Sequence, residues 1–546
     1  MVPEVTGLPQ DGAPEPAAPT STWRRVVRRR DPGAPAGRPE NLYRVVAGVA
    51  LGVVLLAVVG AVLGPRWTPE PLERVVEVET ARTAIGGAPS LRTYDVREVV
   101  VTVPLDGTSV QARISVPVGA TGPLPGVVFV HGAGTGKFAQ AFTAQARALA
   151  EHGVVAMVPD KRLDTYTTRH RDYVAMAQDY LRSVDLLRDR PEVDPARVSV
   201  YAESEGGWIA PVMAVDDPSI EAVVLVSSPV VPPRQQAAFA VDAYLRNTGV
   251  PDAVFRAIPR AVGMTMPGGG FEYADFEVRP WQQRMTQPVL VVYGTGDASM
   301  PIVQGALQVR DDVAHAGNED VTVRYYQDAD HGIRVGGQVV PAFLDDLSGW
   351  VLGLPGTRDA EPRVAGAQPF QPYVAGPVPQ PRWLRDGDVM LGLVIGAPAL
   401  MLLAGAAVGV SRVVQRTTRR GGRRDAVEDR PRRFGRGVAA RLTVLAAATV
   451  ATVLALIWYL VAIARLAMDY ERNAWVVQGG WVAVRLLGVV AVLAAVLLAR
   501  RVHDVHHAGA AVAPGVVRGF ATWGVLTGSA VLLVVLAYWG VFQLGI

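Results

Sequence analysis

Residues 194–207 read DPARVSVYAESEGG, and this stretch decides the fold of the central part of the chain. The apolar run at 198–201 predicts a buried strand, and a helical pattern follows the paired glycines. Between them Ser204 lies in the pattern small-x-Ser-x-Gly, with Ala202 and Gly206 as the small residues. A strand-to-helix turn this tight brings the backbone on either side of the serine together, so only minimal side chains fit. We therefore predict that Ser204 is a nucleophile; the alternative is a serine that only caps the helix.

Strands and helices alternate on both sides of this turn, which predicts an α/β domain with a mostly parallel sheet. The sheet should open with a hairpin and continue through apolar strands, at 99–103, 110–116, 126–130, 154–158, 222–226, 289–293 and 321–326. The helices between the strands are expected at 138–151, 172–187 and 302–313. A long insertion, about 228–287, interrupts this alternation.

The stretch 194–207 resembles the nucleophile region of α/β-hydrolases, and it is closest to the dienelactone-hydrolase-like and serine-peptidase-like branches. The likeness covers about 95–354 and leaves out the apolar segments at both ends of the chain. It implies an α/β-hydrolase fold, a mostly parallel sheet flanked by helices, with the insertion at 228–287 as a cap over the active site. Ala202 stands where glycine is more usual, a departure that one methyl group can tolerate.

The resemblance also nominates the two partners that a serine needs, a base and a group that orients the base. In this fold they follow in the order serine, acid, histidine. Residues 288–297 resemble the strand and acid loop of the family, which nominates Asp297. Asp328 and Asp330 are the nearest competing carboxylates, but they lie beside the histidine. Residues 328–332 match the histidine loop, so His331 is the expected base.

The oxyanion hole should combine the backbone N–H of Glu205 with an N–H from the loop after the third strand. The sequence His-Gly-Ala-Gly at 131–134 stands where the family has this loop, so Ala133 is the candidate second donor and Gly132 the next. The following residues superficially resemble a phosphate-binding loop. The spacing of that motif fails here, and we reject nucleotide binding.

The chemistry is better determined than the substrate. Hydrolysis of a carboxylic ester through an acyl-serine is the leading interpretation, with a small-molecule or lipid acyl substrate. Peptide cleavage and acyl transfer use the same residues and stay open, as does a non-enzymatic binding or sensing domain on the same fold. The aromatic residues of the insertion suit either an acyl pocket or packing of the cap: Phe239, Tyr244, Phe255, Phe271, Tyr273, Phe276 and Trp281.

Five apolar segments are long enough, or nearly so, to cross a bilayer, which takes about 20 residues. They lie at about 43–64, 389–410, 442–464, 482–499 and 520–542. Arginine-rich blocks at 24–30, 412–436 and 500–501 fall on one side if the spans alternate. Cytoplasmic flanks carry the positive excess, so the segment between the first two spans should be extracytoplasmic, at the cell membrane.

The expected organisation has five parts. They are a disordered cytoplasmic tail (1–42), a retained signal anchor (43–64), an extracytoplasmic α/β-hydrolase domain (70–355), a linker (356–386) and a four-helix transmembrane region (387–546). A cleaved signal peptide is the less favoured alternative for the second part.

Composition narrows the function further. The net charge is only +3, which gives no support to a nucleic-acid partner, and the chain has no cysteine, which excludes disulfides and thiolate metal sites. We expect no cofactor and no metal, since His503, His506 and His507 have helical spacing but lack clear carboxylate support. Protein partners stay open. The richness in Ala, Val, Gly and Arg is typical of a GC-rich bacterial genome.

Overall fold

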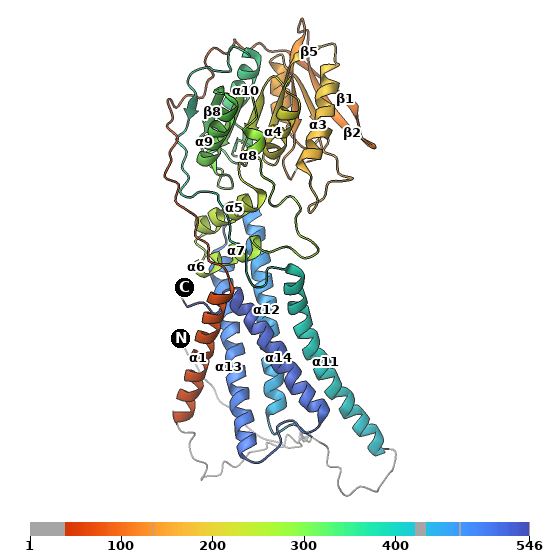
Figure 1. Cartoon of the computed structure of the whole chain (residues 1–546), viewed down its shortest axis with the longest axis vertical. Helices are drawn as coiled ribbons and strands as arrows, with labels where there is room; N and C mark the ends of the chain where they lie inside the picture. The colour runs from red at the N-terminus through yellow and green to blue at the C-terminus, as the bar shows by residue number, and fades with distance from the viewer. Residues whose placement is uncertain (1–38, 135, 421–432, 469–470, 545–546) are drawn as a thin grey trace, which may run out of the picture.

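A globular α/β part stands on a bundle of long helices (Figure 1). The computed structural model describes residues 39–134, 136–420, 433–468 and 471–544. The expected tail, up to residue 38, and part of the arginine-rich loop, 421–432, lie outside the described residues.

The centre of the globular part is a nine-stranded sheet with the order β1-β2-β4-β3-β5-β6-β7-β8-β11. The β1–β2 hairpin and the β2–β4 pair are antiparallel, and every other pair is parallel. The strands are β1 (Asp95–Leu105), β2 (Thr108–Val118), β3 (Leu124–Val130), β4 (Val155–Pro159), β5 (Val193–Glu203), β6 (Val223–Val226), β7 (Val289–Gly294), β8 (Val321–Tyr326) and β11 (Val364–Gly366). Parallel strands covered on both faces read as continuous apolar runs, and all six residues of β7 are buried. The predicted mostly parallel sheet is confirmed.

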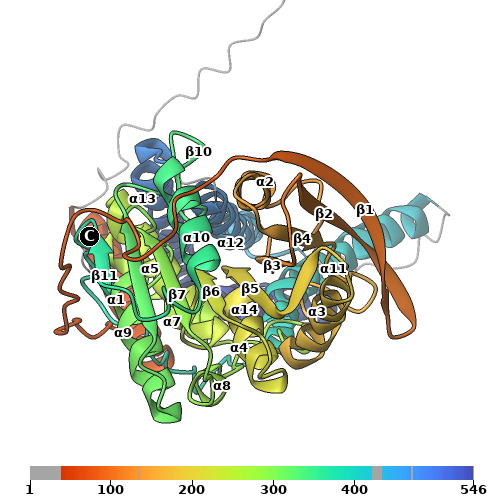
Figure 2. The ribbon, with the colours of Figure 1, turned by 90° about the horizontal axis from the view of Figure 1, so that it is seen from above.

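Helices cover both faces of this sheet (Figure 2). The helices α3 (Tyr173–Arg188), α4 (Gly206–Asp216) and α9 (Ile302–Val313) share one apolar cluster, while α2 (Thr143–Glu151) and α10 (Pro341–Gly353) share the other. Neighbouring strand residues alternate between the clusters, as Val128 and Val127 do. Helix α2 begins later than the expected 138, because Phe142 has a left-handed φ of 56° and buries its ring against Phe129 and Tyr201.

The insertion between β6 and β7 forms four helices, and three of them lie between the sheet and the helical bundle (Figure 1). They are α5 (Pro233–Thr248), α6 (Asp252–Phe255), α7 (Ala257–Val262) and the short α8 (Arg279–Gln282). Apolar side chains of α5–α7 share one cluster with side chains of the long helices, such as Met401, Tyr459 and Leu536. The Tyr244 hydroxyl donates to the Glu471 carbonyl at 2.8 Å, and Arg260 of α7 donates to the carbonyls of Gly60 and Tyr538. The insertion therefore joins the sheet to the bundle.

Five helices in the described ranges are long and apolar enough to cross a membrane. They are α1 (Pro39–Leu63), α11 (Gly387–Arg420), α12 (Val438–Met468), α13 (Gly480–His507), which a π-helical turn at Trp475–Gly479 precedes, and α14 (Val516–Tyr538). At the end of the bundle away from the sheet, one cavity is lined by Arg412, Arg416, Arg433, Arg436 and Arg518. Arginines from three parts of the chain thus gather at the same end of the bundle.

The segment 356–386, expected as a linker, also contributes to the globular part. Its residues Val364–Gly366 form β11, which pairs in parallel with β8 and is the edge strand of the sheet. Further along, Tyr373 bridges to Pro71 and Asp386 bridges to Thr265 of the insertion. The strand β11 is an element that the apolar pattern did not predict, because it is only three residues long.

Candidate active site

Ser204 occupies the sharp turn between β5 and α4. Its φ is 55°, a left-handed value that is uncommon for a residue with a side chain, and its N–H donates to the Val226 carbonyl at 3.0 Å. A Cβ added to Gly206 would lie 2.8 Å from the Val130 carbonyl oxygen, and one added to Gly207 would lie 2.4 Å from Ser228 Oγ. The small residues of the motif are therefore required by close backbone packing, and the strained conformation holds Ser204 at the carboxyl edge of the sheet.

Asp297 and His331 come together at the same edge. Asp297 follows β7, His331 follows β8, and His331 Nδ1 lies 2.8 Å from Asp297 Oδ2. The other oxygen of Asp297 accepts from the Ser299 N–H at 3.0 Å and from Ser299 Oγ at 2.6 Å. The competing Asp330 instead accepts the backbone N–H groups of Gly332 and Arg334, so it shapes the histidine loop.

The electrostatics of this pair suit a base. Burial is the largest single effect on His331 and lowers its pKa. The charge of the Asp297 carboxylate and its hydrogen bond to the ring oppose burial, and together with the other nearby carboxylates they bring the pKa above its usual 6.5. Glu203, next to Ser204, is close enough to raise the pKa of His331 further. Burial raises the pKa of Asp297, while His331 and Ser299 outweigh it and bring the pKa below its usual value. A proton taken up by His331 is therefore stabilised by an ionised carboxylate.

The candidate oxyanion loop lies directly against the serine. A Cβ added to Gly132 would lie 3.1 Å from Ser204 Cβ and 3.7 Å from Ser204 Oγ. Within the described ranges, no protein acceptor takes the backbone N–H of Ala133 or of Glu205. The loop begins at the buried His131, whose Nε2 lies 2.6 Å from the Pro159 carbonyl and whose pKa burial lowers to about 4. Two N–H groups are thus available on either side of Ser204.

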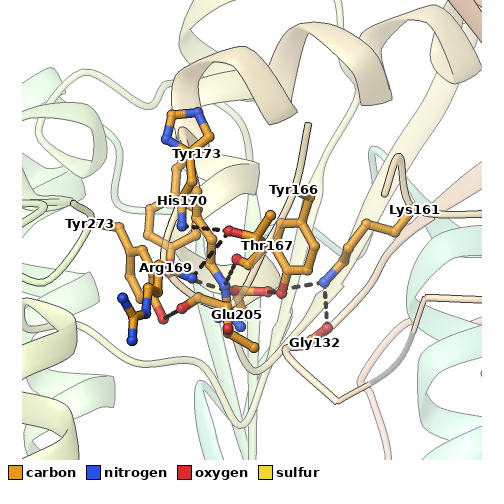
Figure 3. Close-up of polar contacts among 11 residues, drawn as sticks. Gly132, Lys161, Tyr166, Thr167, Arg169, His170, Tyr173, Glu205 and Tyr273 are labelled. Carbon is orange, nitrogen blue, oxygen red and sulfur yellow. Dashed lines mark hydrogen bonds and ion pairs between the residues drawn. The ribbon is translucent and has the colours of Figure 1, made fainter. Parts of the chain in front are cut away.

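Sequence reasoning missed a buried charge network around the Glu205 side chain (Figure 3). The Glu205 carboxylate accepts from Lys161 Nζ at 2.9 Å, from the Tyr166 hydroxyl at 3.1 Å, from the Tyr173 hydroxyl at 3.2 Å and from Arg171. Glu205 and Lys161 are each only 2% exposed. The contacts join residues 32 to 44 positions apart, so no local pattern could show them. The one signal was that Lys161 and Lys137 are the only lysines in a chain that otherwise uses arginine.

Most aromatic residues of the insertion pack against protein. Tyr273 and Phe276 lie edge-on against Tyr173, with ring centroids 5.8 and 5.0 Å apart. Phe239 is buried in a sheet cluster, and Tyr244 packs with the long helices. For these side chains the structure favours packing over an acyl pocket.

The carboxyl edge of the sheet faces the helical bundle. Gln236 of α5 donates to the Ser299 carbonyl at 2.6 Å, next to Asp297. A cavity of about 400 Å³ is lined by Gly296, Ala298 and Ser299 of the acid loop, by Ala467 near the end of α12, and by Arg472 beyond that helix. The loop that carries Asp297 is therefore separated by this cavity alone from the end of a helix that is long enough to cross a membrane.

Residues 140–354 match the sequence model of the prolyl oligopeptidase family. This range contains Ser204, Asp297 and His331, and in the structure it includes the parallel strands β4–β8. The globular part of the chain is an α/β-hydrolase domain. It is of the serine-hydrolase type, joined in this chain to helices of membrane-spanning length.

Several solved structures resemble the hydrolase domain. A protein described as a dipeptidyl aminopeptidase IV from Bacteroides ovatus is 18% identical with a TM-score of 0.35; the match covers 47% of this chain but only 35% of that one. Est1E from Butyrivibrio proteoclasticus is 17% identical with a TM-score of 0.33, over 47% of this chain and 98% of that one. A dienelactone hydrolase from Anabaena variabilis is 18% identical with a TM-score of 0.32, over 47% and 96%. Among curated proteins, none matches the sequence.

Proposed function

We propose that this protein is a membrane-anchored serine hydrolase that cleaves a carboxylic ester through an acyl-serine intermediate. The observation that carries the proposal is the hydrogen-bonded His331–Asp297 pair, which lies at the same carboxyl edge of the sheet as Ser204 in its left-handed turn. Three residues from three loops in the order serine, acid, histidine form the constellation that acyl transfer needs.

The proposed reaction has two halves. Ser204 Oγ attacks the ester carbonyl carbon while His331 Nε2 takes the hydroxyl proton, and Asp297 stabilises the imidazolium through Nδ1. The oxygen of the tetrahedral intermediate is held by the N–H groups of Glu205 and Ala133. His331 then protonates the departing alcohol, and water attacks the acyl-serine by the same route to release the acid.

The arginine distribution supports an extracytoplasmic hydrolase domain. The arginines gathered at the far end of the bundle mark the cytoplasmic side by the positive-inside rule. The carboxyl edge with Ser204 then faces the outer surface of the membrane, with the end of α12 close to the acid loop. This placement favours an amphiphilic or lipid ester whose acyl group reaches the site from the bilayer surface.

Peptide cleavage is the second candidate, and the match to the prolyl oligopeptidase family favours it. Both reactions pass through an acyl-serine, so the leaving group alone separates them.

The test uses the full chain in detergent micelles, treated with a fluorophosphonate probe and assayed with p-nitrophenyl esters of increasing chain length and with dipeptide p-nitroanilides. Ser204→Ala should abolish labelling and turnover. The matched control Ser219→Ala changes an exposed serine whose hydroxyl donates to Asp217, and it should keep both labelling and turnover. Ester turnover that exceeds anilide turnover supports the ester hydrolase, and the reverse supports the peptidase. A folded wild-type chain without labelling and turnover would refute the enzyme reading and favour a binding domain.

A further inference from the structure

The end of strand β4 holds the candidate oxyanion loop at several points. The Pro159 carbonyl lies 2.6 Å from His131 Nε2 at the start of the loop, and the Lys161 N–H donates to the Gly136 carbonyl at 2.8 Å beyond it. The middle of the loop is held by a side chain, since Lys161 Nζ donates to the Gly132 carbonyl at 2.6 Å. These contacts join a loop after β3 to residues after its neighbour β4.

Lys161 also contacts the other half of the candidate oxyanion hole. The same ammonium donates to the Glu205 carboxylate at 2.9 Å, and Glu205 immediately follows the nucleophile (Figure 3). Lys161 lies over the ring of Tyr166, with Nζ 4.7 Å from the ring centroid, and is almost completely buried. A buried ammonium with two strong acceptors is held in one geometry, whereas the side chain of a solvated lysine moves between several.

The bond to Gly132 has a consequence for the next N–H group. The Gly132 carbonyl and the Ala133 N–H belong to one peptide unit, which is not among the cis peptides of the structure. In a trans peptide these two groups point in opposite directions. A donor that holds the carbonyl therefore holds the N–H on the other side. If this peptide rotated, a carbonyl oxygen would replace the N–H, and it would repel an oxyanion instead of binding it.

We propose that Lys161 is a positioning residue of the oxyanion hole, which orients the Ala133 N–H through the Gly132 carbonyl and anchors Glu205 through its carboxylate. The inference rests on the proposed acyl-serine mechanism. Lys161 does not touch the reacting atoms. It fixes two separate backbone segments relative to each other, so that both N–H groups are already aimed when negative charge develops on the carbonyl oxygen.

The test compares wild-type and Lys161→Met full-length chains in detergent. The variant keeps the apolar stem and removes the donors, while Arg171 still pairs with Glu205. Loss of one oxyanion donor costs about 100- to 1000-fold in kcat, so we expect a fall of that size with KM within about threefold. The affinity for an alkyl trifluoromethyl ketone, which forms a tetrahedral oxyanion on the serine, should fall by a similar factor. The affinity for an alkyl amide of equal length should not change.

Two further variants separate positioning from general damage. Lys137→Met is the matched control, because Lys137 is about half exposed and pairs with Asp160; its kcat should stay within about threefold of wild type. Lys161→Gln offers the Gly132 carbonyl an uncharged N–H donor, on a side chain one atom shorter than lysine. It should retain at least about tenfold more activity than Lys161→Met, whereas a role limited to neutralising Glu205 predicts equal losses.

Each outcome decides between the proposals. Parallel losses in kcat and in ketone affinity, with amide affinity unchanged, support the positioning role. A labelled and active wild type with a Lys161→Met variant of equal kcat would overturn this role and leave the acyl-serine mechanism intact. The same holds if ketone and amide affinities fall together. A wild type that is neither labelled nor active would overturn both proposals.

Discussion

Replacing Glu205 by glutamine tests the buried charge network directly, because it removes the one anion that two buried or half-buried cations share. Lys161 and Arg171 both contact this carboxylate, and the Tyr166 and Tyr173 hydroxyls contact it as well. A glutamine amide can still accept on one side. On the other side it presents an N–H₂ group to a cation, either Lys161 or Arg171, which has no acceptor for it.

The magnitude follows from burial. Removing one partner of a buried ion pair costs about 3–5 kcal/mol, since the remaining charge stays out of water without compensation. Glu205 is 2% exposed and Lys161 has the same exposure, so neither solvent nor salt screens the loss. For a domain of a few hundred residues, a destabilisation of 1 kcal/mol lowers the unfolding midpoint by about 2–4 °C. We expect the midpoint to fall by about 10 °C.

The assay is thermal unfolding of the full chain in detergent, followed by tryptophan fluorescence. Glu203→Gln is the matched control on the other side of Ser204. The Glu203 carboxylate accepts from the Tyr201 hydroxyl at 3.2 Å and forms no ion pair within the described ranges, and burial raises its pKa. Glutamine keeps the shape of the side chain and an acceptor for the Tyr201 hydroxyl, and no cation loses its partner, so the control should change the free energy of unfolding by less than about 1 kcal/mol. Equal midpoints for the two variants would refute the reasoning that the paired charges stabilise this turn.

Three other predictions address the site. Asp297→Asn should lower kcat on the order of 10⁴-fold. In the wild type, the rise of kcat/KM with pH should centre above pH 6.5, because His331 must be neutral to act as the base. In the variant, pH–rate profiles should show this rise at a lower pH. The pKa of His131 is about 4 in the folded protein and near 6.5 in the unfolded chain. The free energy of unfolding should therefore be unaffected by this group above pH 6.5 and should fall by about 3 kcal/mol as the pH is lowered towards 4. Unfolding midpoints across this range should change less in His131→Asn. Gly207→Ala would place a methyl group 2.4 Å from Ser228 Oγ and should destabilise the protein by about 1–3 kcal/mol. Adding Ser228→Gly should restore most of the lost thermal unfolding midpoint, and a double variant without this recovery would contradict the assigned clash.

Local chemistry explains what could be predicted from the sequence. The turn at Ser204 can be recognised in the sequence because close packing demands glycine at fixed positions beside the serine. The mostly parallel sheet can be recognised because its strands are continuous apolar runs. Asp297 and His331 were nominated by position in the fold, and the structure brings them within hydrogen-bond distance. The candidate site was thus largely predictable as far as it depends on the order of strands and loops.

Contacts between distant segments explain what was missed. Lys161 and Arg171 meet Glu205 only after β4, α3 and β5 have packed, and nothing in their local sequence indicates a buried acceptor. The insertion was expected as a cap, and its aromatic residues suited a pocket or packing equally. Its docking onto the long helices depends on apolar side chains such as Leu245 and Val254, which are of a kind found on the buried face of any amphipathic helix. Pattern alone cannot say which partner such a face will meet.

The docking of α5–α7 on the long helices has a consequence for the hydrolase as a free enzyme. If the chain were cut between the hydrolase domain and the helices, the side chains of Ala238, Leu245, Val250, Val254 and Ile258 would lose their partners and form an apolar face towards water. Large exposed apolar patches promote aggregation or attachment to other surfaces. A released domain would therefore tend to self-associate or return to a bilayer, and a clean soluble enzyme would need polar substitutions on this face. For the membrane-anchored hydrolase that we propose, shedding by proteolysis would therefore be a poor way to act at a distance, and its substrates would be limited to those that reach the membrane.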